Sequence, residues 1–337
     1  MNWLRKLLFP FAILYGLITS IRNFLYDVGL LKAYSFNIPV IAVGNLSVGG
    51  TGKTPQIEYL IRLLSPQYKI ATLSRGYKRL SKGFVLADST ANAASLGDEP
   101  FQYYKKFPQI QVAVDADRRN GITQLLAQKV KPEVILLDDA FQHRKVKAGF
   151  YVLLTSYDDL FCNDFILPTG NLRESRSGAK RATMIVVTKC PPTISEQEQE
   201  AIKKKINIEV PLFFSCIEYD DKVYNNTETL SVATTKSEAK VLLAGIAKPK
   251  PFLEYLQGEN DEVMIFPDHH DFSERDIVAI QNKAKEKIIV TTEKDFVRIE
   301  NKAAITSLYY LPIKSKLLNH QEEFDSRVTQ YVAKHSK

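Results

Sequence analysis

From residue 38 onward, the chain alternates between short apolar runs and segments with apolar residues at helical spacing. Apolar runs bounded by polar residues or glycine are typical of strands buried on both faces of a sheet. IPVIAV, YKIATLS, QVAVD, EVILLDD, FYVLLT and TMIVVTK have this form, and KTPQIEYLIRLL has the spacing of a helix. The pattern predicts a mostly parallel sheet flanked by helices over residues 36–210.

A second alternating pattern begins near residue 241. The segments KVLLAGI, EVMIFP, KIIVTT and SLYYLPI are interpreted as strands, whereas PFLEYL and SERDIVAIQNKAKEK have helical spacing. We therefore expect a smaller C-terminal α/β domain over residues 241–337. Residues 211–240 are interpreted as an extended linker that acts as a hinge between the two domains.

Residues 1–35 form an apolar N-terminal segment. Its apolar run from Leu7 to Ile21 contains Pro10 and Gly16 and is shorter than the roughly 20 residues that span a bilayer. We expect a helix lying at the membrane surface, with its apolar side in the lipid and basic residues near anionic headgroups. Residues expected at that interface are Trp3, Arg5, Lys6, Arg22 and Lys32. Two alternatives stay open: a signal peptide, although no small-residue cleavage site follows, and a helix packed on the protein's own core.

Composition and charge narrow the choice of partners. The 337 residues are 45% hydrophobic and 25% charged, which allows a large soluble core. The formal charge of +7 is spread over patches near residues 75–82, 173–181 and 203–205, so we expect anionic ligands or a membrane surface and no nucleic acid. The three cysteines form no Cys-x-x-Cys pair, which fits a reducing cytoplasmic setting without disulfides or zinc.

A glycine-rich segment, GNLSVGGTGKTP, lies between the first predicted strand and the first predicted helix of the sheet. Phosphate binding needs inward-facing backbone N–H groups at a helix N-terminus, an ammonium group and a hydroxyl for Mg²⁺. The strict P-loop pattern has glycine where this chain has Ser47. We expect Ser47 to complete the turn without positive φ, while Gly44 absorbs curvature. The predicted nucleotide contacts are Asn45, Ser47, Val48, Gly49, Gly50, Thr51, Gly52, Lys53 and Thr54.

Two aspartates, Asp138 and Asp139, end the predicted strand VILLDD. P-loop proteins hold or orient magnesium with carboxylates at such a strand end. Either feature alone has an ordinary explanation, a chance glycine-rich turn or a solvated pair of aspartates. Together they predict a site for ATP and Mg²⁺, with Thr54 and the two aspartates as metal ligands and Lys53 on the β and γ phosphates. Guanine is disfavoured because the segment TKCP has proline where a guanine-binding aspartate is needed.

Eight segments, in order, give the chain a resemblance to the tetraacyldisaccharide 4'-kinase family. They are VGNLSVGGTGKTP, LSRGYKR, GDEP, LLDDAFQHR, LPTGNLRE, AGIAKPKPF, FPDHHDF and TTEKDFVR. The resemblance covers nearly the whole chain and includes Ser47. It implies a P-loop NTPase-like fold and phosphoryl transfer from ATP to the 4'-hydroxyl of a lipid A disaccharide precursor. It also implies a location at the cytoplasmic face of the inner membrane of a Gram-negative bacterium.

The same resemblance implies that Asp98, in GDEP, works with His269, in DHH, on the acceptor hydroxyl. A positioned proton acceptor contributes roughly 10²–10⁴-fold to a reaction. Alternatives stay open for each residue: Asp98 as a helix N-cap, and His270 in place of His269. Glu99 is predicted as a further metal ligand, with a first-turn carboxylate favoured by the helix dipole as the alternative.

Basic and polar residues near the predicted strand ends are candidates for the anionic donor and acceptor. For each of them a solvated or packed side chain is the alternative. The candidates are Arg75, Tyr77, Arg79, Arg118, Arg119, His143 and Arg173.

Two other function classes stay open at this stage. One is a soluble small-molecule P-loop kinase whose apolar N-terminal segment packs internally, and the other is a membrane-bound nucleotide switch. For the lipid kinase we expect a peripheral, monomeric protein that uses ATP and Mg²⁺.

Overall fold

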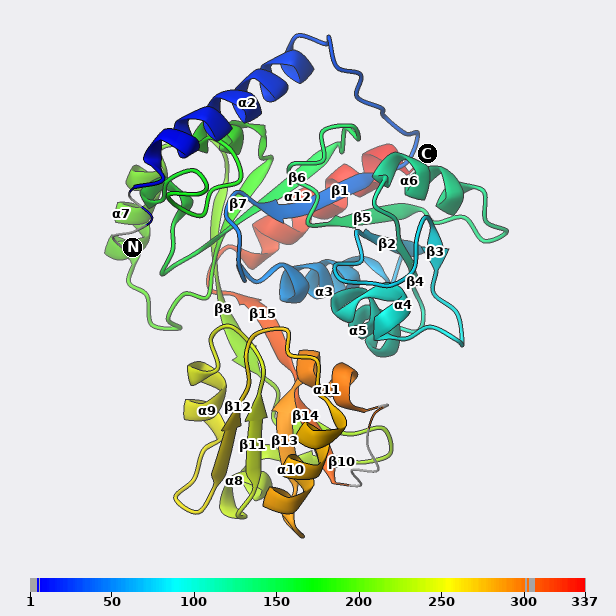
Figure 1. Ribbon diagram of the computed structural model, residues 1–337. Coiled ribbons are helices and arrows are strands. Elements are labelled where there is room, and N and C mark those ends of the chain that lie inside the picture. Colours follow the sequence, from blue (N-terminus) through cyan, green and yellow to red (C-terminus); the bar gives the residue numbers. More distant parts are fainter. Residues whose placement is uncertain (1–4, 6, 301, 303–306, 337) are drawn as a thin grey trace.

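The computed structural model describes residue 5, residues 7–300, residue 302 and residues 307–336. Trp3 and Lys6, two of the residues expected at a membrane interface, lie outside the described residues. Figure 1 shows a large sheet flanked by helices, with a smaller α/β unit below it.

The larger sheet has nine strands in the order β15-β8-β7-β6-β1-β5-β2-β4-β3. Neighbouring strands from β8 to β4 are parallel, and the edge strands β15 and β3 are antiparallel to their neighbours. This is the predicted mostly parallel sheet, so the expected fold class is confirmed. The strands are β1 (Val40–Asn45), β2 (Ile70–Ser74), β3 (Val85–Leu86), β4 (Gln111–Val114), β5 (Val134–Asp138), β6 (Phe150–Ser156), β7 (Met184–Thr188), β8 (Leu212–Tyr219) and β15 (Ile313–Leu317).

Helices cover both faces of this sheet, which explains why its strands are apolar on both sides. Alternate residues of β1 belong to different cores: Ile41 packs with Ile57 of one helix, and Ala42 packs with Ile122 of another. The helices of this unit are α3 (Lys53–Leu64), α4 (Ala93–Leu96), α5 (Asp98–Lys106), α6 (Arg118–Leu126), α7 (Glu196–Ile206) and α12 (Gln321–His335), with 3₁₀ turns at Phe161–Asn163 and Arg176–Arg181.

The smaller sheet has six strands in the order β10-β9-β14-β13-β11-β12. Its strands are β9 (Lys222–Tyr224), β10 (Thr229–Ser231), β11 (Val241–Ala244), β12 (Glu262–Ile265), β13 (Ile289–Thr292) and β14 (Leu308–Leu311). Its helices are α8 (Val232–Ser237), α9 (Lys250–Leu256), α10 (Glu274–Ala284) and α11 (Glu293–Ile299). The predicted strands and the predicted helices α9 and α10 are present, whereas the hairpin of β9 and β10 and the helices α8 and α11 were not predicted.

The smaller unit is an insertion between β8 and β15, which pair with each other at the edge of the larger sheet. The predicted single strand SLYYLPI is two strands in different sheets, since Pro312 has no N–H to donate to a ladder. Residues 313–335, assigned from sequence to the C-terminal domain, lie on the larger sheet, and the predicted linker of residues 211–240 contains β8, β9 and β10. The chain returns to the larger sheet because Phe324 and Val328 of α12 are buried in the same core as the apolar residues of α3.

The N-terminal helix α2 (Phe9–Asp27) packs on the larger unit through small side chains. Its buried residues are Ala12, Gly16 and Thr19, and a Cβ on Gly16 would lie 3.1 Å from Ile166 Cδ1. Its large apolar side chains point outward; Phe11 is 63% exposed and Ile18 57%. The structure thus lacks the alternative arrangement, in which these side chains pack on the protein's core. None of the helices in the described part of the chain combines the length and apolarity of a membrane-spanning segment.

Candidate active site

The loop between β1 and α3 has the backbone geometry of a phosphate cradle. Gly49 and Gly52 have φ of 111° and 81°, in the left-handed region that favours glycine. Ser47 is not among the described residues with positive φ, so serine is compatible with its place in this turn. Gly44 has a different role from the one expected: a Cβ there would lie 2.8 Å from Phe141 Cβ and 2.9 Å from its amide nitrogen. It is needed for close packing within β1 and not for curvature.

Neighbouring loops brace this cradle. Val48 donates its amide N–H to the Asn171 carbonyl at 2.8 Å, and the Thr188 hydroxyl donates to the Thr51 carbonyl at 2.8 Å. Lys189, which follows β7, donates from Nζ to the Gly50 carbonyl at 2.6 Å, and burial lowers its pKa. The sequence marks this segment as a strand end that lacks a guanine-binding aspartate, but it does not indicate that Lys189 braces the loop.

Asp138 and Asp139 lie beside the cradle because β5 pairs directly with β1. Lys53 Nζ lies 3.7 Å from Asp139 Oδ1, and Arg173 Nη1 donates to both oxygens of Asp139 at 3.0 Å. Burial opposes ionisation of Asp139, but the charges of Lys53 and Arg173 lower its pKa. Asp138 differs: burial, and then repulsion from Asp139 and Glu99, raise its pKa to about 6.

These residues fit a magnesium ion. Asp138 Oδ1 is buried and has no hydrogen-bond partner among the described residues, although Oδ2 accepts from the Ser74 and Tyr103 hydroxyls at 3.4 and 3.3 Å. No cluster of three or more His, Cys, Asp or Glu side chains in the described part of the chain forms a complete metal cage. Mg²⁺ needs no such cage, since it is commonly held by one or two carboxylates, substrate phosphates and water. Asp138 and Asp139 are two carboxylates of this kind, and Thr54 as a third ligand stays a prediction.

A second group of charged side chains joins the N-terminus of α5 to the smaller unit. Asp98 is the first residue of α5, and the N-cap is Gly97, so the alternative of Asp98 as an N-cap is not the observed arrangement. His269 Nδ1 lies 3.4 Å from Asp98 Oδ2, and Arg298 donates to the same oxygen from Nε at 2.8 Å and from Nη2 at 2.6 Å. Arg298 lies in the quoted segment TTEKDFVR, but sequence reasoning gave it no role.

His270 and Glu99 have separate partners. His270 Nε2 lies 3.0 Å from Asp276 Oδ2 and its ring stacks on Phe266, so His269 is the histidine that meets Asp98. Glu99 Oε1 accepts from Lys294 Nζ at 2.7 Å. Burial disfavours the charged form of Glu99, but Lys294 outweighs this effect and the pKa falls to about 2. Glu99 is therefore a carboxylate near the aspartate pair.

The remaining candidates separate into exposed and structural positions. Arg75 is exposed at the end of β2, and Tyr77 packs edge-to-face on His269 with 5.7 Å between ring centroids. Arg79 donates to the Ser81 hydroxyl at 3.0 Å and the Gly83 carbonyl at 2.6 Å. Arg118 is buried and donates to the Asp115 and Asp138 carbonyls, at 2.8 and 3.3 Å, while Arg119 lies 3.8 Å from the centroid of the Tyr34 ring.

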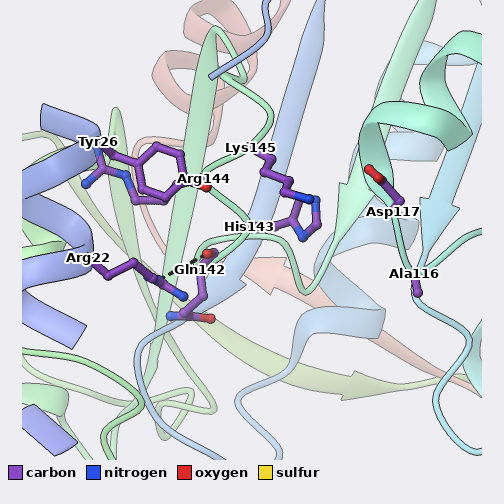
Figure 2. A pocket seen from close by; sticks show the side chains of 8 residues that line it. All are labelled: Arg22, Tyr26, Ala116, Asp117, Gln142, His143, Arg144 and Lys145. Carbon is purple, nitrogen blue, oxygen red and sulfur yellow. Dashed lines mark hydrogen bonds between the residues drawn. The ribbon is translucent and has the colours of Figure 1, made fainter. Parts of the chain in front are cut away.

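His143 lies in an open cavity of about 420 Å³ between α2 and the loop after Asp139 (Figure 2). Arg22 and Tyr26 line it from α2, and Lys145 and Arg144 line it from the loop. Burial, and then the charge of Arg118, lower the pKa of His143 to about 4, and its Nε2 is buried without a partner among the described residues. Sequence reasoning identified His143 but could not show that α2 supplies the opposite wall.

Hydrogen bonds connect α2 to the two loops next to the aspartate pair. Tyr15 donates its hydroxyl to the Arg173 carbonyl at 3.0 Å, and Asn23 donates to Glu174 Oε2 at 2.6 Å. Arg22 donates to the Gln142 carbonyl at 3.3 Å, as Figure 2 shows. The N-terminal helix is thereby placed against the same loops that hold Asp139.

Comparisons with known proteins agree along the whole chain. Residues 4–333 match the family described as Tetraacyldisaccharide-1-P 4'-kinase. A tetraacyldisaccharide 4'-kinase of Flavobacterium johnsoniae is 67% identical over 334 residues, covering 98% of each chain, and one of Bacteroides thetaiotaomicron is 43% identical, covering 99% of this chain and 95% of the relative. The crystal structure of LpxK from Aquifex aeolicus in complex with ATP has a TM-score of 0.82 and 33% identity, covering 98% of this chain and 99% of that one. The chain therefore belongs to the Tetraacyldisaccharide-1-P 4'-kinase family.

Proposed function

We propose that this chain is an ATP-dependent kinase that phosphorylates the 4'-hydroxyl of a tetraacyldisaccharide 1-phosphate, a lipid A precursor. The observation that carries the proposal is the placement of Lys53 3.7 Å from Asp139, where β1 and β5 end side by side. Ligands of parallel sheets bind at the carboxyl ends of strands, so a triphosphate in the cradle would meet both charges.

At the donor end, residues 45–54 hold the nucleotide with backbone amides at the N-terminus of α3 on the phosphates, and Lys53 neutralises charge on the β and γ groups. Thr54, Asp138 and Asp139 would hold Mg²⁺, which when bound would further neutralise the phosphate oxygens. Lys53 and Arg173 keep Asp139 ionised through their lowering of its pKa. Glu99 would be a further ligand of the metal.

At the acceptor end, Asp98 receives the proton of the 4'-hydroxyl. The O–H bond breaks as the hydroxyl oxygen forms a bond to the γ phosphorus, and the bond from that phosphorus to the bridging oxygen breaks, so that ADP leaves with the electron pair. His269, whose Nδ1 lies 3.4 Å from Asp98 Oδ2, works beside Asp98 on the acceptor hydroxyl.

The cavity under α2 suits the anionic end of the acceptor. Arg22, Arg144 and Lys145 bring positive charge, and Gln142 connects this cavity to Arg173 and so to Asp139. Arg75 adds an exposed guanidinium at the neighbouring strand end. A phosphate on the disaccharide would be paired there with charge-assisted hydrogen bonds.

The exposed apolar side of α2 supports a peripheral position of the monomer on the cytoplasmic face of the inner membrane of a Gram-negative bacterium. Large apolar side chains each contribute roughly 1.5–3 kcal/mol when fully buried, which is more than the about 1 kcal/mol of a basic residue near anionic lipid. Insertion of α2 would place the cavity next to the headgroups. We also propose that β8 and β15 act as the hinge between the larger nucleotide-binding unit and the smaller unit that carries His269.

Transfer of label from γ-labelled ATP to a tetraacyldisaccharide 1-phosphate tests the function. Lys53→Ala should lower the rate at least about a hundredfold, because the lysine stabilises charge that develops on the phosphates. Lys250→Ala is the control, since Lys250 is an exposed residue of α9 that pairs with Glu254 of the same helix. A membrane-bound nucleotide switch would hydrolyse ATP slowly and label no lipid. Full activity of Lys53→Ala would refute the assignment of the loop.

A further inference from the structure

The guanidinium of Arg298 connects the two side chains expected to handle the acceptor proton. Its Nε and Nη2 donate to Asp98 Oδ2 at 2.8 and 2.6 Å, and Nη2 also donates to His269 Nδ1 at 2.9 Å. The Arg298 side chain is only 7% exposed. A buried guanidinium with this many short contacts is held in one orientation.

Residues of the smaller unit hold the side of the Arg298 guanidinium that faces away from Asp98. Nη1 donates to Asp295 Oδ1 at 3.0 Å and to the Gly245 carbonyl at 3.4 Å. Asp295 is fully buried and is itself held by the Gly245 amide at 2.8 Å and the Thr292 hydroxyl at 2.7 Å. Contacts within the smaller unit therefore orient the guanidinium independently of Asp98.

The contact with His269 determines where the imidazole carries its proton. Arginine has five N–H donors and no acceptor, so the ring nitrogen that meets it must be an acceptor. In the neutral ring this leaves Nδ1 unprotonated and places the proton on Nε2. The 3.4 Å separation between Nδ1 and Asp98 Oδ2 is then not a hydrogen bond from His269, and the carboxylate is oriented by Arg298 instead.

The contact with Asp98 leaves one carboxylate oxygen available. In the described structure, the contacts of this side chain with Arg298 and His269 are all made by Oδ2. Oδ1 accepts no hydrogen bond from a described residue, and the Asp98 side chain is 21% exposed. Oδ1 is therefore the oxygen that a hydroxyl of the acceptor can approach.

We propose that Arg298 is a positioning residue of the phosphoryl-transfer reaction, an inference that rests on the proposed function. It holds Asp98 by Oδ2 so that Oδ1 receives the hydroxyl proton, and it keeps His269 in the Nε2-protonated form. Arg298 does not touch the reacting atoms and acts through Asp98 and His269.

A purely structural role for Arg298, as a bridge between α11 and α5, makes a different prediction. The same helices are also joined by Lys105 of α5 and Glu300 after α11, whose Nζ and Oε2 lie 3.4 Å apart. Lys105→Met removes an ion pair between the same two units without touching Asp98 or His269. It is the matched control for Arg298→Met.

The test uses the full chain, with kinetics and ¹⁵N-histidine NMR, in which the His269 signals are assigned among the five histidines with His269→Gln. In the native chain, Nδ1 of His269 should have the ¹⁵N chemical shift of an unprotonated ring nitrogen. Arg298→Met should lower kcat about tenfold to a hundredfold, part of the 10²–10⁴-fold due to a positioned proton acceptor, with KM for ATP changed less than about twofold. Arg298→Lys, which keeps a cationic donor, should recover part of kcat and keep Nδ1 unprotonated.

Three results would overturn the proposal: a native His269 with protonated Nδ1, an unchanged kcat in Arg298→Met, or an equal loss in Lys105→Met. Thermal unfolding of each variant separates loss of folding from loss of positioning, and the NMR measurement on the native chain needs no variant to fold other than the one used for assignment. If the native chain labels no lipid, the proposed function fails, while the NMR spectrum still reports the contact between Arg298 and His269.

Discussion

The helices α2 and α12 both pack on the larger unit, yet they present opposite sides to it. α12 buries Phe324, Val328 and Val332, each fully, as an amphipathic helix on a protein core does. α2 buries only small residues and leaves Phe11 and Ile18 largely exposed. Apolar content alone therefore does not indicate which side of a helix faces the protein. In the described structure the large apolar side chains of α2 face away from the protein, and we propose that lipid covers them.

The first expected effect is on membrane binding. Exchanging Phe11 and Ile18 for Gln removes two large apolar side chains from the outward side of α2, a loss of about 3 kcal/mol and therefore about a hundredfold in partitioning onto anionic vesicles. Ile265 and Val278, which are 59% and 54% exposed on the smaller unit, provide the matched double variant to Gln. Flotation with phosphatidylglycerol vesicles measures both. Equal binding of the two double variants would contradict a lipid-facing α2.

The second effect is on the free energy of unfolding, which should depend on the apolar side of α12 and not on that of α2. Phe324→Ala leaves a cavity between Tyr59 and Phe213, whose rings lie 5.6 and 5.2 Å from its centroid. Loss of a buried phenylalanine lowers the free energy of unfolding by about 3–5 kcal/mol. Phe11→Ala should change it by less than about 0.5 kcal/mol, because its side chain is exposed in the absence of lipid. Denaturant unfolding measures both variants, and a comparable loss in Phe11→Ala would show that α2 stabilises the fold through its apolar side.

The same contrast shows how far the sequence could predict this structure. The parallel sheet, the phosphate loop and the aspartate pair depend on local patterns, such as VILLDD after an apolar run, and they could be identified in advance. Which side of α2 faces the protein could not be identified, because its packing depends on Gly16 fitting against Ile166, a residue distant in the sequence. For the same reason the return of α12 to the larger sheet had no local signal.

Within the site, the unpredicted parts are those that connect distant segments. Asp98 and His269 were named through a family resemblance, but Arg298 joins them across 200 residues of sequence. Lys189 braces Gly50 from a different strand end, and Gly44 is explained only by the approach of Phe141. A motif identifies the chemistry of a residue, whereas its partners depend on the tertiary structure.

A third, smaller effect tests how α2 is seated. Gly16→Leu adds a side chain where even a Cβ lies 3.1 Å from Ile166, and overpacking of this kind costs about 1–3 kcal/mol. Because Tyr15 donates to the Arg173 carbonyl, displacement of α2 should also raise KM for the lipid acceptor and leave KM for ATP nearly unchanged. Ser20→Leu, at an exposed position of the same helix, is the control. If unfolding and acceptor kinetics are alike for both variants, packing at Gly16 does not determine the position of α2.

The smallest effect is a shift in the titration of His143, which lies beneath α2 and far from α12 in the chain. Burial lowers its pKa to about 4, so the folded chain resists protonation that the unfolded chain accepts near pH 6.5. Stability contributed by His143 is therefore fully present above about pH 6.5 and is lost as the pH falls toward 4. His143→Gln should flatten this part of the pH dependence of unfolding. In Gly16→Leu, a displaced α2 should expose His143 more fully to water, and its pKa followed by NMR should move up toward 6.5, whereas Phe324→Ala should leave the pKa unchanged. An unperturbed His143 pKa in the native chain would mean that α2 does not cover this cavity.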